Sequence, residues 1–230
     1  MNPEEGAKRH ALALSYVLTV GTGAMDAIGF ARLGDVFTSV MTGNLVLLGV
    51  SIGSENGELA ARIAIAFGAF VVGVMVGARV TATRLVEPGA TGFRAVWPSG
   101  VNRALGVQLV VMTAFLIGWE LSGGSPDDEA QVALLLLAAV AMGVQSGAVL
   151  KIGAKGLPTT YVTGTLTNVL AEIATARRAH WAGIGTLLSL LAGAGAAGIL
   201  IFHADRWAAV LPYAALVTVL VLAVRGRRST

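Results

Sequence analysis

Six apolar segments, each about 20 residues long, constrain this sequence more than any other feature. They are Ala11–Phe30, Leu59–Val80, Val101–Leu121, Val132–Leu150, Trp181–Phe202 and Trp207–Val224. A helix rises about 1.5 Å per residue, so about 20 residues cross a hydrocarbon core that is about 30 Å thick. The six segments therefore predict six transmembrane helices in an all-α integral membrane protein, with the lipid bilayer as its first partner.

Composition excludes several other classes of protein. Hydrophobic residues make up 55% of the chain and charged residues 13%, which is too apolar for a disordered protein. The absence of cysteine excludes a disulfide scaffold and a cysteine nucleophile. The net charge is only +3 and the basic residues are scattered, so we expect no nucleic-acid partner. We find no nucleophile with a base and no spacing of metal ligands, so we expect neither an enzyme, nor a cofactor, nor a metal site.

Two shorter apolar segments, Val36–Ile52 and Leu157–Ile173, differ from the six spans because each contains hydroxyl residues and a glycine. The first contains Thr38, Ser39, Thr42, Gly43 and Asn44, and the second contains Thr159, Thr160, Thr163, Gly164 and Thr165. Residues of these kinds lower both the hydrophobicity and the helix propensity of a segment. We therefore expect both segments to be broken, at Gly43 and at Gly164.

The chain could cross the membrane eight times, or six times with the two interrupted segments entering and leaving on the same side. Short cytoplasmic loops carry an excess of Lys and Arg, and this excess separates the two topologies. Eight spans place only half of the 16 Lys and Arg residues inside. Six spans leave only Arg32, Arg62 and Arg206 outside. The sequence thus favours six spans in the cell (inner) membrane, with both termini in the cytoplasm.

This topology divides the chain into five parts. They are a cytoplasmic N-terminus (1–10), a first membrane repeat (11–121), an acidic external loop (122–130), a second membrane repeat (131–224) and a basic cytoplasmic C-terminus (225–230). Both repeats show the same order of features: a span, a basic residue, a glycine, a hydroxyl pair and a Thr-Gly step. Each repeat has three spans, so the second is inverted relative to the first. Inverted repeats with broken segments at corresponding positions are typical of transporters that bind their substrate at the bilayer midplane.

Several motifs of the two halves resemble those of a known family. They are Met41-Thr42-Gly43-Asn44 in the first half, and Ala141-Met142-Gly143-Val144-Gln145 with the second Thr-Gly segment in the other. These residues resemble the YoaK-like family of bacterial inner-membrane proteins, a domain of unknown function. The resemblance extends roughly from Leu14 to Val224. It implies a small bacterial membrane protein with about six spans. It implies no substrate and no site residues, because none is established for the family.

Asp26 is the one clear acid inside a long predicted span, within four residues of the outer end of that span. An ionisable group within a membrane is a functional candidate by default, here as a proton relay or a cation ligand. The alternatives are a structural pairing, for example with Arg32, and simple solvation of the carboxylate at the membrane interface. If Arg32 and Lys151 set the register of the repeat, the counterpart of Asp26 is Gln145.

Two GxxxG motifs predict close helix packing, Gly73 with Gly77 and Gly143 with Gly147. Small residues at this spacing let two helix backbones approach closely inside a membrane. With 30 glycines in the chain such matches arise easily, so the motifs predict packed helices and no particular function.

From these observations we expect a small transporter or channel for a small polar solute or ion. The expected pathway combines Asp26 and Gln145 with Thr38, Ser39, Thr42, Gly43, Asn44, Thr159, Thr160, Thr163, Gly164 and Thr165. Helix packing through small and hydroxyl residues is the alternative interpretation of these segments. A non-transporting membrane scaffold for a partner protein is the alternative function. A second copy of the chain is a candidate partner, because a chain of 230 residues can need one to enclose a pathway.

Overall fold

The computed structural model describes residues 3–82, 90–150, 152, 162–176 and 181–228. These residues form nine α-helices and one short 3-10 helix: α1 (Pro3–Arg32), α2 (Met41–Gly53), α3 (Gly57–Ala82), α4 (Gly92–Val96), α5 (Ser99–Leu121), α6 (Asp128–Val149), α7 (Val162–Ala176), α8 (Trp181–His203), η1 (Asp205–Trp207) and α9 (Val210–Arg228). Six helical stretches are long and apolar enough to cross a membrane. They coincide with the six predicted segments, which confirms an all-α protein with six candidate membrane spans.

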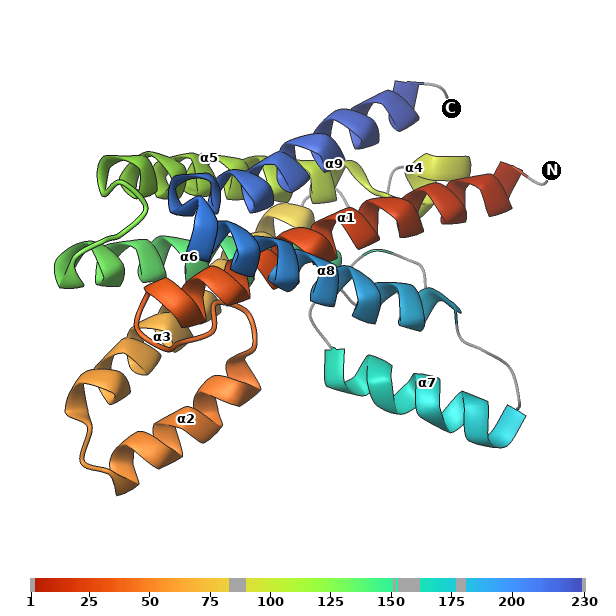
Figure 1. The fold of residues 1–230 in the computed structure, drawn as a ribbon. Helices are drawn as coiled ribbons and strands as arrows, with labels where there is room; N and C mark the ends of the chain where they lie inside the picture. Colours follow the sequence, from red (N-terminus) through yellow and green to blue (C-terminus); the bar gives the residue numbers. More distant parts are fainter. Residues whose placement is uncertain (1–2, 83–89, 151, 153–161, 177–180, 229–230) are drawn as a thin grey trace.

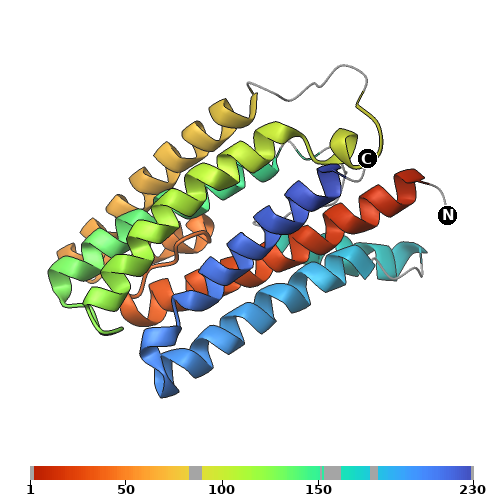
Figure 2. The ribbon, with the colours of Figure 1, turned by 90° about the horizontal axis from the view of Figure 1, so that it is seen from above.

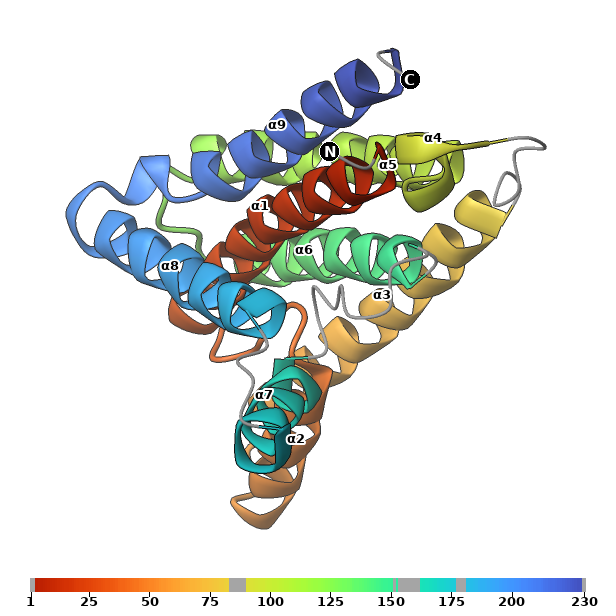
Figure 3. The same cartoon turned by 90° about the vertical axis from the view of Figure 1, so that its right-hand side faces the viewer.

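Two helices, α1 and α6, lie at the centre of the bundle (Figure 3). In their most apolar stretches 67% and 72% of the residues are buried, against 39% or fewer in the other four spans. The two most extensive helix contacts join α3 to α6 and α1 to α8. Helices α5 and α9 cover one side of this core, and α2 and α7 lie on the opposite side (Figure 3).

Glycines allow the backbones of α3 and α6 to touch where the two helices cross. A side chain at Gly73 would fall on the carbonyl group of Val140, and one at Gly143 would fall on the carbonyl group of Phe70. The missing side chains are therefore what permits the crossing, as expected of small residues at helix interfaces in membranes. The close packing predicted from the GxxxG motifs is confirmed for this pair of helices.

The bundle has two distinct ends. Both termini lie at one of them, called here the termini end (Figure 1). At the opposite end α1 finishes, and α3 and α6 begin. Arg62 lies near the start of α3, so we call this the Arg62 end.

The first interrupted segment leaves the Arg62 end and returns to it. Gly34 and Asp35, which follow α1, and Asn56 and Glu58, which lie at the start of α3, line one cavity of about 300 Å³. Between them, residues 36–40 form no helix, and α2 follows with 13 residues. A helix of that length rises only about 20 Å, which is too short to cross the hydrocarbon core.

In the first interrupted segment the break precedes Gly43, and in the second Gly164 lies inside a helix. We expected breaks at Gly43 and Gly164, but α2 begins at Met41 and α7 begins at Val162, so both glycines lie in the first turn of a helix. This prediction was wrong because glycine disfavours a helix only through its backbone freedom, a cost of about 1 kcal/mol that does not by itself end a helix. The non-helical stretch 36–40 is held instead by side chains from elsewhere in the chain.

Candidate functional site

Asp26, near the end of α1, accepts four hydrogen bonds from the stretch that precedes α2. Its Oδ1 accepts from the Thr38 N–H (N···O 2.8 Å), the Ser39 N–H (2.7 Å) and the Thr38 hydroxyl (3.1 Å), and its Oδ2 accepts from the Ser39 hydroxyl (2.6 Å). All three residues are buried. The carboxylate thus satisfies backbone N–H groups that have no helical partner. The structure brings these three predicted site residues together.

Asn44, in the first turn of α2, holds the same stretch from its other side. The Phe37 N–H donates to Asn44 Oδ1 (3.0 Å), and Asn44 Nδ2 donates to the Phe37 carbonyl (2.7 Å). A Cβ at Gly43 would lie 3.3 Å from the Phe37 ring, so Gly43 leaves room for that ring. Thr42 is exposed and does not join the cluster. Asn44 is therefore a positioning residue for the stretch 36–40.

Arg32 does not pair with Asp26. Its guanidinium group donates to the carbonyl of Ile201 (2.8 Å), in the last turn of α8, where the helix dipole favours a positive charge. Among the described residues, Asp26 has N–H and hydroxyl partners and no ion-pair partner. A carboxylate in the bundle is therefore held by neutral donors alone.

Gln145 lies in a second polar cluster, between the central helices and α5. Gln108 Nε2 donates to Gln145 Oε1 (2.8 Å), and Gln145 Nε2 donates to the Thr22 hydroxyl oxygen (2.8 Å). The Thr22 hydroxyl in turn donates to the carbonyl of Leu18 (3.0 Å). Of these three residues, only Gln145 was predicted from the sequence; Gln108 and Thr22 were not.

A periodic pattern of polar residues in α1 could have revealed this cluster. Ser15, Thr19, Thr22 and Asp26 are spaced by four, three and four residues, which places them on one face of a helix. All four are buried. The three hydroxyl groups also donate to the carbonyl four residues earlier. The central helix therefore carries a buried polar stripe, with Asp26 as its last member.

The second Thr-Gly segment is described only in part. Thr159 and Thr160 lie outside the described residues, and of Thr163 only its place in α7 is described. Gly164 is half-buried and Thr165 is buried. Figure 1 shows the first residues of α2 and α7 facing one another beside the bundle, with α2 running toward the Arg62 end and α7 toward the termini end.

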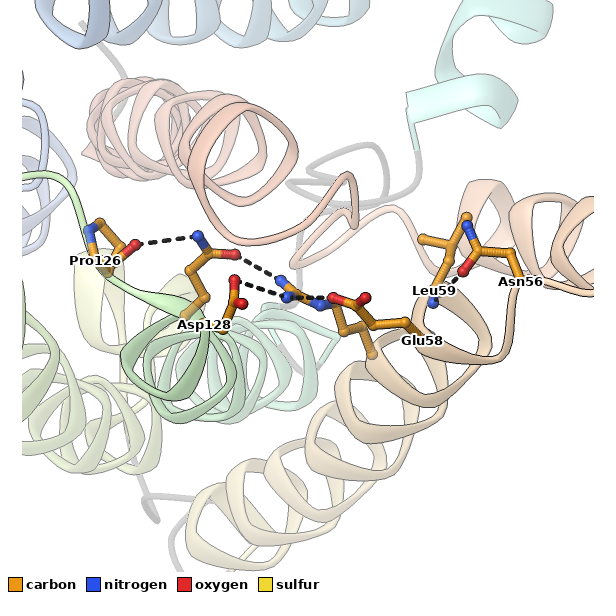
Figure 4. A network of polar contacts seen from close by, with 7 residues as sticks. Asn56, Glu58, Leu59, Pro126 and Asp128 are labelled. Carbon is orange, nitrogen blue, oxygen red and sulfur yellow. Dashed lines mark hydrogen bonds and ion pairs between the residues drawn. The ribbon is translucent and has the colours of Figure 1, made fainter.

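A polar network joins the elements at the Arg62 end (Figure 4). The guanidinium group of Arg62, which is only 7% exposed, donates to Gln131 Oε1 (2.6 Å) and to Glu58 Oε1 (2.7 Å), and it lies 3.5 Å from Asp128 Oδ1. Gly34 has φ +92° and faces this group, so a side chain there would collide with it. Arg62 thus links the starts of α3 and α6 to the loop that follows α1.

Comparison with known proteins identifies relatives but no activity. A family model described as "Protein of unknown function (DUF1275)" matches residues 14–223. The chain is similar to the UPF0700 transmembrane protein YoaK of Bacillus subtilis (strain 168), with 33% identity over 160 residues. The match covers 70% of this chain and 66% of that protein, slightly less than two thirds of its length. No solved structure matches the chain.

Proposed function

Because this chain belongs to the DUF1275 family and is a multi-span membrane protein, we propose that it carries a small polar solute or ion across the membrane. One observation carries the proposal: the buried carboxylate of Asp26 holds the non-helical stretch 36–40 against the end of a candidate span. Irregular backbone at membrane depth is tolerated only inside protein or along a watered cavity. A bundle that merely crossed the membrane six times would not need such a stretch.

The helix contacts support an inverted relation between the two halves. Gly73 and Gly143 lie where α3 crosses α6, and Gly23 and Gly193 lie where α1 crosses α8. Each of these glycines faces a backbone carbonyl of the other helix. Helix α2 packs on α3, as α7 packs on α8. In an inverted repeat, rocking of the halves about a central site opens that site to each side of the membrane in turn.

The distribution of basic residues supports a cytoplasmic termini end in the cell (inner) membrane. The described Lys and Arg residues near the termini end are Lys8, Arg9, Arg79, Arg94, Arg103, Arg225, Arg227 and Arg228. Near the Arg62 end they are Arg32, Arg62 and Arg206. This is the bias expected when the termini end faces the cytoplasm.

Single cysteines at Gly57 and Gly89 test this orientation in intact cells, because the chain has no native cysteine. Gly57 begins α3 at the Arg62 end and has open space for a side chain, whereas Gly89 precedes α4 and lies outside the described residues. A membrane-impermeant thiol reagent is expected to label Gly57→Cys and to leave Gly89→Cys unlabelled until the cells are opened. Labelling of Gly89→Cys alone would contradict the orientation.

Flux into liposomes tests the transport proposal itself. Purified protein is reconstituted, and the entry of urea, glycerol, methylammonium, sodium, potassium and chloride is compared with entry into empty liposomes. At least one of these probes is expected to enter faster through the wild-type chain. Asp26→Asn removes the charge, and Asn44→Ala removes the two hydrogen bonds to Phe37. In both variants the flux should fall about tenfold or more, which corresponds to about 1.4 kcal/mol of lost interaction.

Asp35→Asn is the matched control, because it removes a carboxylate that is exposed in the same loop. Its flux should equal that of the wild type. Full flux in both Asp26→Asn and Asn44→Ala would refute the site, and no flux of any probe would refute the transport function as tested. A partner protein that co-purifies with a flux-free chain would favour the scaffold function instead.

A further inference from the structure

The second polar cluster, formed by Gln108, Gln145 and Thr22, contains an oxygen that accepts no hydrogen bond from the described residues. Gln108 is 1% exposed, and its Oε1 accepts no hydrogen bond from any described residue, although its Nε2 donates to Gln145. A buried acceptor without a donor costs free energy, so native proteins keep few of them. An apolar side chain of similar length would remove this acceptor but would leave Gln145 Oε1 without its donor. The hydrogen bond to Gln145 therefore accounts for the amide nitrogen of Gln108 and leaves its buried oxygen without a partner.

The surroundings of Gln108 favour a hydrogen-bond donor over an anion. On α1, α5 and α6, Asp26 is the one buried charged residue among those described, and no buried cation on these helices offsets it. Asp26 lies one helical turn from Thr22, about 6 Å along the axis of α1. Thr22 in turn accepts the hydrogen bond of Gln145. The region thus combines a carboxylate with oxygen acceptors.

We propose that Gln108 Oε1, supported by Thr22 and Gln145, binds a small solute that donates hydrogen bonds, either an ammonium-type cation or an uncharged N–H or O–H compound. This inference rests on the proposed transport function and deepens it, because it names the class of solute that the pathway accepts. The three residues come from α1, α5 and α6. The bound solute would therefore touch both halves of the chain, as a site between inverted repeats requires.

Gln108→Met is the first variant for testing this site. It keeps the length of the side chain and removes the open acceptor, while Gln145 Oε1 loses the donor that it has now. One buried acceptor is unpaired before the change and one after it, so the melting temperature should change little. Thr113→Val is the matched control on α5, because that hydroxyl already bonds to the Leu109 carbonyl (2.8 Å).

The binding test follows the melting temperature of the detergent-purified chain in methylammonium chloride, urea or glycerol, with sodium chloride at matched concentration as the reference for the salt. At least one donor is expected to raise the melting temperature of the wild type and of Thr113→Val. Gln108→Met should need about tenfold more of that solute for the same increase. A response to methylammonium alone identifies a cation site, and a response to urea or glycerol identifies an uncharged one. No response in the wild type, or an equal response in Gln108→Met, would overturn the proposal.

Gln108→Glu keeps the test decisive if the methionine variant does not fold. It retains oxygen acceptors and adds a negative charge, so methylammonium should raise the melting temperature of this variant more, relative to urea, than it does in the wild type. If the ratio of the two increases stays the same as in the wild type, the result would count against the site. Flux is measured separately in liposomes. A response that depends on Gln108 in a chain without flux would refute transport and leave the binding site in place. Flux that is equal in the wild type and in Gln108→Met would support transport and would overturn the binding site at Gln108.

Discussion

Gly143→Ala is expected to destabilise the chain by about 1–3 kcal/mol or more. The added methyl group would fall on the carbonyl of Phe70 and would lie 3.0 Å from the Cα of Gly73, so the backbones of α3 and α6 would have to separate. This contact involves main-chain atoms, which cannot rotate away as the end of a flexible side chain can. Thermal unfolding in detergent, followed through the four tryptophans, measures the effect.

Gly106→Ala on α5 is the matched control for this prediction. No atom lies within 4 Å of a Cβ at this position, so the substitution adds helix propensity without a collision. It should raise the stability by up to about 1 kcal/mol. If Gly143→Ala melts at the temperature of the parent chain or above it, the crossing of α3 and α6 described here is wrong.

Asp26→Ala is expected to release the stretch 36–40 and to destabilise the chain by about 2–6 kcal/mol. The substitution leaves the N–H groups of Thr38 and Ser39 without their acceptor, and each unpaired buried N–H group costs about 1–3 kcal/mol. Hydrogen–deuterium exchange at these two amides should become faster. The melting temperature of the chain should fall at the same time.

Asp26→Asn separates the charge of Asp26 from its hydrogen bonds. It retains Oδ1, which accepts three of the four bonds, so exchange at Thr38 and Ser39 should stay close to that of the parent. Asp35→Asn is again the control, because Asp35 has φ +58°, a conformation that asparagine adopts more readily than most residues. Unchanged exchange in Asp26→Ala would show that the carboxylate does not hold the stretch.

The sequence alone predicted the membrane spans, because their signal is local. About 20 consecutive apolar residues must form a helix to pair their backbone groups in lipid, whatever surrounds them. For this reason the six predicted segments and the six candidate spans coincide. Asp26 could also be identified from sequence, since an acid inside an apolar segment is rare. The GxxxG motifs predicted close packing, although not which helices would meet.

The tertiary structure decided how the polar residues combine. Gln108 is a polar residue in the apolar middle of α5, and nothing within α5 indicates that it lies in one cluster with Thr22 and Gln145. Likewise, the break before α2 depends on a carboxylate 12 residues earlier in the chain, so the local preference of Gly43 misplaced it. Helix formation in a membrane follows from the composition of each segment alone. The pairing of buried polar groups depends on which helices touch, and only the packed bundle determines that.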